Sequence, residues 1–426
     1  MQVELRYGRG MLPVRLPEGL EVTVVRKPPM PALADPAGVF RRALGPLAAQ
    51  ARGKASACIL VCDLTRPVPN GLLLRPMIEA LLAAGIDRAR ITVLVATGLH
   101  RPNLGAELEE VIGDPWVLQT VRVENHDARD DAAHVEVGVT KSGTRVLLDR
   151  RFVEAGVRVV TGLVEPHFMA GWSGGRKVIA PGVAHRETIT TLHSARFMAH
   201  PLADNCVLDG NPLHRDQLEI AAMVKPVLAA NAVIDEQRRV SFVNFGEVIE
   251  SHAEAVRFVE QYVRVPLPHA FHTVVASAAG HPLDRTYYQT VKGMVAPLAI
   301  LEPGGTLVVA SECAEGMGSR EYVAAQKRLI ALGPEGFAGS IEPKRYADID
   351  EWQTQMQLKP LRKGDLLLYT TGLRGEDRAL TGVRLAESVE QAVLDSVHRS
   401  GDRRVAVIPE GPYVVPFVGT AVAPPR

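Results

Sequence analysis

The stretch SACILVCDLTRP, residues 56–67, decides the fold class of this 426-residue chain. It begins as an unbroken apolar strand that ends at polar residues, and a helix candidate, GLLLRPMIEALLAAG (71–85), follows it directly. A second apolar strand, ITVLVATG (91–98), comes next. Strands that are apolar throughout are covered on both faces, which is typical of parallel sheets between layers of helices. The sequence therefore predicts an α/β protein with a doubly wound sheet.

The alternation of strands and helices continues toward the C-terminus. GVRVVTGLV (156–164) predicts a third strand, and a second α/β series begins with TVVASAAG (273–280). The stretch between them, from about 204 to 244, looks helical and polar, and PLPHAFH (266–272) is typical of a linker. A single core stops growing at about 250–300 residues.

We therefore predict two doubly wound α/β domains, an N-terminal domain over residues 1–268 and a C-terminal domain over residues 273–402. A further strand candidate, RVAVIPEG (404–411), lies in the last stretch of the chain, residues 403–426. This strand could belong to either sheet, and the stretch could thereby complete the N-terminal sheet.

The composition narrows the class of ligand and the compartment. Lys and Arg total 48, as do Asp and Glu, so the overall charge does not favour nucleic acid or an acidic membrane as a partner. A small neutral or anionic ligand is favoured instead. No apolar run reaches the ~18 residues that a membrane span needs. The four cysteines are scattered along the chain, which argues against a disulfide framework. We expect a cytoplasmic protein.

Polar residues follow each of the first three predicted strands. Asp63, Leu64, Thr65 and Arg66 follow the first strand, and a carboxylate, a hydroxyl and a guanidinium there could hold a phosphate or a carboxylate. The alternative is a turn capped by Asp63 with Arg66 in solvent. In open α/β sheets, ligands bind outside the carboxyl ends of the strands, so these residues are candidates for a site.

His100 follows the second predicted strand and His167 follows the third. In a parallel sheet both would project from one edge and could flank one ligand. Two imidazoles with an ordinary pKa near ~6.5 can exchange protons with a substrate at neutral pH, as an acid/base pair. The alternative is that one or both are metal ligands.

Lys177 follows the glycine-rich turn SGGR at residues 173–176. The turn fails the Walker pattern because Arg176 precedes the lysine where glycine is required, and Val178 follows it. Lys177 could instead be a point of covalent attachment, or it could be solvated. His193 ends the helix candidate RETITTLH and could cap that helix or bind a metal.

In the second half, Tyr288, Gln289 and Lys292 lie on one helix candidate. Gln289 and Lys292 are three residues apart and share a helical face, where an amide beside an ammonium suits a carboxylate or phosphate. The alternative is an exposed polar face.

Together, these motifs resemble the lactate racemase family, which uses a nickel-pincer nucleotide. The motifs keep the family's order and spacing, and they are DLTRP (63–67), ATGLHRP (96–102), EPHFMAGWSGGRK (165–177), His193 and YQTVK (288–292). The resemblance implies two α/β domains with the active site in the cleft between them. It also implies racemisation or epimerisation of a 2-hydroxyacid, such as lactate or malate, by hydride abstraction and return through the cofactor.

The resemblance also implies a role for each matching residue. His100 and His167 would be the catalytic acid/base pair, and Lys177 would tether the cofactor, pyridinium-3,5-bisthiocarboxylic acid mononucleotide nickel. His193 would be the metal ligand. Further cofactor contacts are implied for Asp63, Leu64, Thr65, Arg66, Gln289 and Lys292, and substrate contacts for Arg66, Tyr288, Gln289 and Lys292. Cofactor-assembly proteins would be partners. Trp172 stands where the family pattern has Phe, which changes pocket size more than chemistry.

Two other functions remain open on the sequence. A zinc-dependent hydrolase could use His100, His167 and His193 as joint ligands. A non-catalytic two-domain protein could bind a small acid. Spare cations for a second carboxylate could be Arg101, Arg176 or Arg285.

Overall fold

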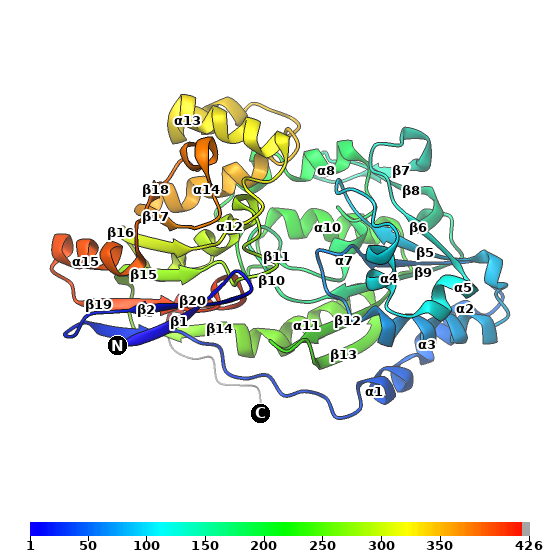
Figure 1. Cartoon of the computed structure of the whole chain (residues 1–426). Helices are drawn as coiled ribbons and strands as arrows, with labels where there is room; N and C mark the ends of the chain where they lie inside the picture. Colours follow the sequence, from blue (N-terminus) through cyan, green and yellow to red (C-terminus); the bar gives the residue numbers. More distant parts are fainter. Residues whose placement is uncertain (420–426) are drawn as a thin grey trace. The chain divides into compact units, whose positions relative to one another are not determined.

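The computed structural model describes residues 1–419, which form two compact units (Figure 1). The N-terminal unit contains Pro29–Leu192 and Val207–Glu260. The C-terminal unit contains Met1–Pro28, His193–Cys206 and the chain from Gln261 onward. Each unit has its own six-stranded sheet, and parallel pairing dominates both. The predicted class, a two-domain α/β protein, is confirmed.

The N-terminal unit is built on a sheet in the order β13-β12-β9-β4-β5-β6. Its strands are β4 (Ala57–Cys62), β5 (Ile91–Ala96), β6 (Arg122–Asn125), β9 (Val157–Leu163), β12 (Leu228–Ile234) and β13 (Val240–Glu247). All neighbours pair in parallel except β12 and β13, which are antiparallel. Because β4 lies between β5 and β9, the carboxyl ends of these three strands meet at one edge.

Helices cover both faces of this sheet, as its apolar strands predict. On one face, Ile59 and Val61 of β4 share a core with Leu73 and Leu74 of α3, and α6 and α7 pack against β4 on the other. The helices are α1 (Pro36–Ala43), α2 (Gly45–Ala51), α3 (Asn70–Ala83), α4 (Ala106–Ile112), α5 (Pro115–Thr120), α6 (Arg150–Val153), α7 (Arg176–Ile179), α8 (Arg186–Leu192), α10 (Pro212–Met223) and α11 (Val248–Val263). Two small hairpins complete the unit, β7 (His134–Val139) with β8 (Arg145–Asp149), and β10 (Pro166–His167) with β11 (Gly171–Trp172).

The C-terminal unit is built on a fully parallel sheet in the order β18-β17-β16-β15-β19-β3. Its strands are β3 (Glu21–Val24), β15 (Phe271–Ser277), β16 (Leu301–Ala310), β17 (Asp365–Tyr369), β18 (Arg384–Leu385) and β19 (Arg404–Ile408). Its helices are α9 (Ala195–Met198), α12 (Tyr287–Val295), α13 (Arg320–Ile341), α14 (Glu351–Lys363) and α15 (Val389–Ser400). Helices α12 and α14 pack on one face of the sheet.

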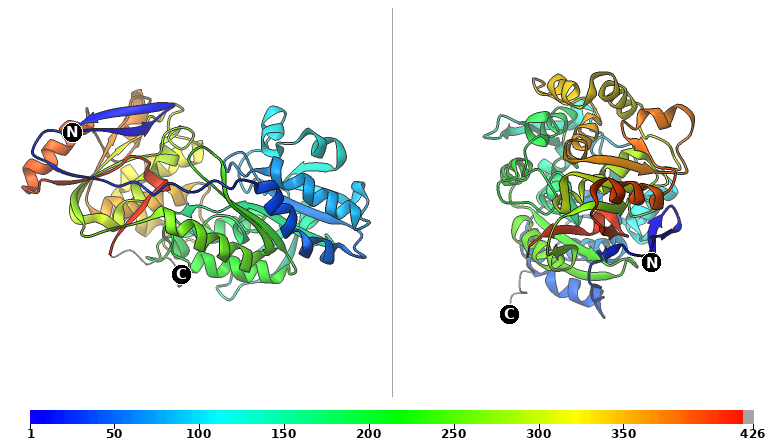
Figure 2. Two further views of the ribbon diagram at one scale, coloured as in Figure 1. Left: turned by 90° about the horizontal axis from the view of Figure 1, so that it is seen from below. Right: turned by 90° about the vertical axis from the view of Figure 1, so that its left-hand side faces the viewer.

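The N-terminal hairpin of β1 (Gln2–Tyr7) and β2 (Gly10–Arg15) covers the other face together with α15. Val3 and Leu5 of the hairpin share a core with Val275 of β15 and with Val389 and Val393 of α15. Figure 2 shows this hairpin in dark blue close to α15 in red-orange. The first residues of the chain therefore complete the C-terminal unit.

The two units differ from the predicted domain limits, 1–268 and 273–402. Residues 1–28 belong to the C-terminal unit because β3 pairs in parallel with β19. The strand predicted within 403–426 does not complete the N-terminal sheet, because β19 pairs with β15; residues 420–426 of that stretch lie outside the described residues.

Two shorter predictions are also wrong. The supposed linker PLPHAFH contains the end of β14 (Arg264–Leu267), which pairs with β20 (Val415–Val418), and the start of β15. The supposedly helical stretch 204–244 contains β12 and most of β13 beside α10. Within residues 1–419, no helix is long and apolar enough to cross a membrane.

Candidate active site

The predicted site residues fall into two groups, one in each unit. Asp63 to Arg66, His100, His167 and Lys177 belong to the N-terminal unit. His193, Tyr288, Gln289 and Lys292 belong to the C-terminal unit. Sequence reasoning placed His193 in the N-terminal domain; this is wrong, because the segment His193–Cys206 packs with the C-terminal unit.

Asp63 and His100 form a pair at the ends of neighbouring strands β4 and β5. Oδ2 of the buried Asp63 lies 2.6 Å from Nδ1 of His100, and its Oδ1 accepts a hydrogen bond of 2.6 Å from Oγ1 of Thr65. Burial acts to raise the pKa of Asp63, but the hydrogen bonds and charge of His100, with the Thr65 contacts, lower it below its usual value. Asp63 is therefore ionised at neutral pH.

This pairing selects the tautomer of His100. An ionised carboxylate only accepts hydrogen bonds, so Nδ1 of His100 carries the hydrogen. In the neutral ring, Nε2 then holds a lone pair and can act as a base. The side chain is 56% exposed, which leaves the ring accessible to a substrate.

His167 is held differently, in the small hairpin of β10 and β11. Its side chain is buried, and its Nδ1 accepts hydrogen bonds from the backbone N–H groups of Met169 (3.3 Å) and Ala170 (3.2 Å). Because Nδ1 accepts, the neutral ring carries its hydrogen on Nε2. The two neutral imidazoles therefore have opposite tautomers. Nε2 of His100 carries a lone pair and can act as a base, whereas Nε2 of His167 carries a hydrogen and can act as a donor.

Arg66 connects the end of β4 to the end of β9. Its Nη1 donates a hydrogen bond to Oε1 of Glu165, which directly precedes the hairpin that carries His167. Both side chains are about four-fifths buried, so this ion pair is more firmly fixed than a surface pair. At the same edge, the backbone N–H of Leu64 donates to Oδ1 of Asn103 at 3.2 Å.

Lys177 lies in the first turn of the short helix α7 and is partly exposed. Burial, followed by the positive charge of Arg66, lowers its pKa to about 8, and Arg176 contributes to the same effect. An amine with this pKa is partly neutral near neutral pH. A neutral lysine amine is a nucleophile, as a covalent attachment point requires.

Arg176 is fully buried, which the sequence did not indicate. Its Nη1 and Nη2 donate hydrogen bonds to the carbonyl oxygens of Trp172 (3.0 Å) and Ala170 (2.9 Å), and its Nε donates to Nδ1 of His214 (3.0 Å). Nη1 also lies 2.9 Å from Nε2 of His252. The two carbonyl oxygens and Nδ1 of His214 are neutral acceptors, and burial lowers the pKa of Arg176 to about 9. Arg176 therefore fixes the turn that follows His167.

The glycines of this turn serve close packing. A Cβ atom on Gly162 of β9 would lie 2.8 Å from Cα of Gly174, and one on Gly175 would lie 2.8 Å from Cβ of His252. Gly174 and Gly175 also have positive φ angles, 77° and 49°. The turn thus brings Lys177 close against the sheet without forming a Walker-type loop.

In the C-terminal unit, one tryptophan joins two of the predicted residues. The rings of His193 and Trp352 have centroids 4.6 Å apart, and Nε1 of Trp352 donates a hydrogen bond of 3.3 Å to the hydroxyl of Tyr288. Gln353 donates from its side chain to the backbone oxygen of Tyr288. His193, Trp352 and Tyr288 therefore form one contiguous group.

Gln289 and Lys292 lie on α12 with Tyr288. Oε1 of Gln289 is buried and has no hydrogen-bond partner in the described part of the chain. A buried amide oxygen without a partner costs stability, and a bound donor would satisfy it. This atom therefore fits a ligand contact.

The spare cations named from the sequence have other surroundings in the structure. Arg101 pairs with Glu107, Arg285 pairs with Glu315, and Arg176 is buried. Within residues 1–419, no three His, Cys, Asp or Glu side chains gather as a metal site.

Sequence reasoning missed three contributors, Glu165, Arg176 and Trp352. Glu165 stands two residues before His167, and a carboxylate at a strand end could have been matched with Arg66. Arg176 was named only as a spare cation for a second carboxylate. Trp352 follows Asp350 and Glu351 in a polar stretch, DIDEWQTQ, that gives no signal of a site.

Comparison with known proteins finds matches along most of the chain. Residues 7–205 match the lactate racemase N-terminal domain, and residues 269–415 match the lactate racemase C-terminal domain. The lactate racemase of Thermoanaerobacterium thermosaccharolyticum is 29% identical over 436 residues, which cover 97% of this chain and 98% of that protein. The lactate racemase of Lactiplantibacillus plantarum is 30% identical over 368 residues, 86% of each chain.

Solved structures give the same result. The lactate racemase apoprotein from Thermoanaerobacterium thermosaccharolyticum has a TM-score of 0.89 at 28% identity and covers 99% of this chain and 100% of that one. A protein from Thermotoga maritima has a TM-score of 0.68 at 16% identity, covering 90% of this chain and 98% of that one, and shares the fold. The chain belongs to the lactate racemase family and is an isomerase, a racemase.

Proposed function

We propose that the protein racemises or epimerises a 2-hydroxyacid, lactate in the first place, with His100 and His167 as its acid/base pair. The observation that carries this proposal is the opposite tautomers of the two imidazoles. Inversion at a carbon that bears a hydroxyl needs a base for one enantiomer and an acid for the other, with the roles exchanged in the reverse direction. Asp63 orients the base and stabilises its protonated form.

The residues of the chain also fit the nickel-pincer nucleotide of the family. Lys177 has a lowered pKa, as an amine that forms a covalent link requires, and Gln289 offers a buried oxygen without a partner. His193 presents an imidazole, a ligand type that suits nickel. Asp63 to Arg66 and Lys292 would contact the nucleotide. When bound, this group would accept and return the hydride of the substrate carbon.

The protein would supply position and proton transfer. Arg66, although paired with Glu165, would be available to a substrate carboxylate, with Tyr288, Gln289 and Lys292 as further contacts. In one direction His100 would take the proton of the substrate hydroxyl at Nε2, and His167 would give a proton from its Nε2 to the oxygen of the inverted product. In the reverse direction these two transfers would run backward. We further propose that cofactor-assembly proteins load the chain in the cytoplasm, where its cysteines, which form no disulfide among residues 1–419, would remain reduced.

The test is a chiral assay on protein purified from a host that assembles the cofactor. We expect interconversion of D- and L-lactate, or of another 2-hydroxyacid in a panel. His100→Asn and His167→Asn should each lower kcat by about 10²–10⁴. His398→Asn, an exposed histidine on α15, is the matched control and should leave kcat unchanged.

Cofactor attachment is measured separately from turnover. Intact-mass spectrometry should find an adduct on the wild type and on His100→Asn, and none on Lys177→Arg, because a guanidinium does not form the link. Metal analysis should show nickel that His193→Ala loses. A loaded wild-type protein that turns over no acid in the panel would contradict the proposed reaction.

A further inference from the structure

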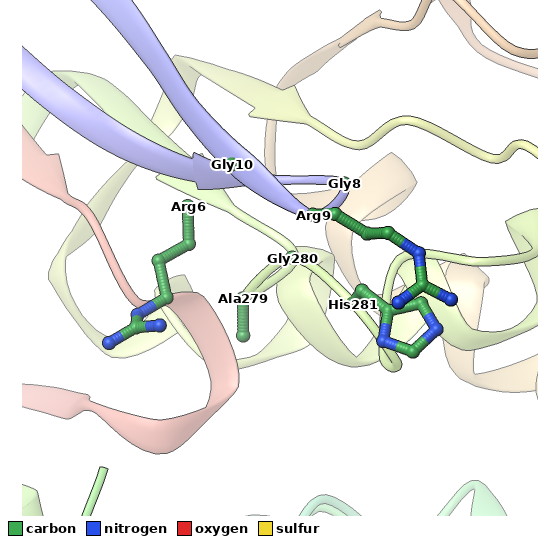
Figure 3. Close-up of a pocket in the computed structure, with 7 residues that line it drawn as sticks. All are labelled: Arg6, Gly8, Arg9, Gly10, Ala279, Gly280 and His281. Carbon is green, nitrogen blue, oxygen red and sulfur yellow. The ribbon is translucent and has the colours of Figure 1, made fainter. Parts of the chain in front are cut away.

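A polar pocket lies in the C-terminal unit, at the turn between β1 and β2. Its volume is about 210 Å³, enough for a small anion with its bound water. Figure 3 shows the pocket, and its lining residues are Arg6, Gly8, Arg9, Gly10, Ala279, Gly280 and His281. None of these residues belongs to the candidate active site.

The pocket lies at the topological switch point of the C-terminal sheet. After β15 the chain continues to β16 on one side, whereas β19 pairs on the other side. Ala279 to His281 follow the carboxyl end of β15, and Arg6 donates from its backbone N–H to the oxygen of Pro409, which follows β19. In open α/β sheets, ligands bind outside the carboxyl ends of the strands at this point.

The buried carboxylate of Asp284 and one backbone hydrogen bond fix the turn that carries Arg9. Oδ2 of the buried Asp284 accepts hydrogen bonds from the N–H groups of Gly8 (2.6 Å) and Glu312 (3.2 Å). The N–H of His281 donates to the oxygen of Gly8 at 2.7 Å. The hairpin turn and the loop after β15 are thus joined directly, so the two sides of the pocket are held in place before any ligand arrives.

The two arginines that line the pocket differ in whether a carboxylate lies beside them. Arg6 pairs with Glu410, with Nε 3.2 Å from Oε1. Arg9, by contrast, has no carboxylate oxygen within 4 Å in the described part of the chain, and Figure 3 shows its guanidinium extending toward the His281 ring. The N–H of Gly280 has no backbone partner among residues 1–419. The side of the pocket at Arg9 and His281 therefore presents donors and positive charge.

The charged groups around His281 also act more strongly against its protonated form than for it. Partial burial, then the positive charges of Arg9 and Arg285, lower the pKa of His281, and the carboxylates of Asp284 and Glu315 offset this only in part. An anion bound beside Arg9 would offset the positive charge of Arg9 and raise the pKa of His281. Because the anion and the proton then favour each other's binding, the anion should bind more tightly as the pH falls.

We propose that Arg9 and His281 form a binding site for a small oxyanion, a carboxylate or a tetrahedral phosphate-type group. The guanidinium supplies paired N–H donors, and the imidazole supplies a further donor when protonated. The site would take a free anion or the acidic group of a small metabolite that fits the pocket. It is independent of the cofactor and of the proposed reaction.

Calorimetric titration of the full chain tests the proposal, with two probes in low-chloride buffer. Sulfate represents the tetrahedral group and keeps its charge between pH 5 and 9, and malonate represents the carboxylate. We expect at least one probe to bind, and its affinity should fall about tenfold or more in Arg9→Gln. In His281→Asn the increase in sulfate affinity from pH 8 to pH 6 should disappear.

Arg403→Gln is the matched control. Arg403 is an exposed arginine of the same unit, directly before β19 and hence at the opposite edge of the sheet. Its loss should leave both affinities unchanged. Thermal unfolding of each variant shows that it is folded. The proposal would be overturned by the absence of binding for both probes, by undiminished binding in Arg9→Gln, or by an equal loss in Arg403→Gln.

Discussion

Nδ1 of His100 lies 2.6 Å from Oδ2 of Asp63, and this hydrogen bond joins the carboxyl ends of two neighbouring parallel strands. The carboxylate is buried, whereas more than half of the imidazole is exposed. One partner is thus fixed by the sheet and the other is presented to solvent. In this geometry the carboxylate of Asp63 fixes the orientation of the imidazole of His100, as in a general base held by a buried acid.

Asp63→Asn tests this pairing. The amide keeps the shape of the side chain but removes its charge, and its NH2 group can no longer accept from Nδ1 of His100. We expect kcat/KM to fall about tenfold to hundredfold, with the protein still folded. Racemisation kinetics and thermal unfolding measure the two effects. A variant that racemises at the wild-type rate would contradict the orienting role.

Arg176→Met tests the buried arginine. The substitution leaves the carbonyl oxygens of Trp172 and Ala170 buried without donors, so the free energy of unfolding should fall by about 2–5 kcal/mol. Urea unfolding measures the change. Arg150→Met is the control, because Arg150 forms an exposed pair with Glu154 and should change stability by less than about 0.5 kcal/mol.

Lys177→Met tests the lowered lysine pKa in the protein without cofactor. The folded-state pKa, about 8, lies below the ordinary 10.5, so between these values the unfolded state binds more protons and wild-type stability rises with pH. Lys177→Met should therefore exceed the wild type in stability near pH 7, by about 1–3 kcal/mol. This advantage should shrink between pH 8 and 10.5. Urea unfolding at several pH values measures the stability of both proteins. A stability difference that does not change with pH would mean that the pKa of Lys177 is not lowered.

A buried histidine pair predicts loss of stability in acid. Nε2 of His126 lies 3.0 Å from Nε2 of His134, and burial lowers the pKa of His126 to about 4. Below pH 6.5 the unfolded state binds a proton that the folded state does not, so stability should fall between pH 6.5 and 4, by on the order of 3 kcal/mol. His126→Gln should flatten this part of the pH–stability curve. An unchanged slope in that variant would assign the acid sensitivity to other groups.

Trp352→Phe separates positioning from metal binding. Phenylalanine keeps an aromatic ring beside His193 but removes the N–H that donates to the hydroxyl of Tyr288. We expect kcat/KM to fall about threefold to tenfold, mainly through KM, while nickel content stays at the wild-type level. Loss of nickel in this variant would mean that the ring itself supports the metal site.

Much of the fold was predictable because its sheets are buried on both sides. The apolar runs that became β4, β5 and β9 are continuous, and each ends at polar residues whose place at the sheet edge follows from parallel pairing. Asp63 and His100 could therefore be expected near each other. Their tautomers could not, because these depend on hydrogen bonds that only the folded backbone defines.

The misjudged features depend on partners that are distant in sequence. Arg176 looks like a solvated cation until His214 and the carbonyls of its own turn enclose it. His193 follows the N-terminal segments along the chain, yet it belongs to the C-terminal unit and packs there against Trp352. Local patterns carry no information about such long-range contacts, which tertiary packing decides.

The pairing of β3 with β19 has a consequence for biosynthesis. The two strands are separated by about 380 residues, so at roughly 5–20 residues per second the ribosome delivers the partner of β3 some 20–80 seconds after β3 itself. During that interval the first strand of the sheet to be synthesised lacks its neighbour. Neither unit is one continuous piece of sequence, so a C-terminal fragment that began at Gln261 would lack β1, β2 and β3. The C-terminal sheet can therefore be completed only when nearly the whole chain has been synthesised.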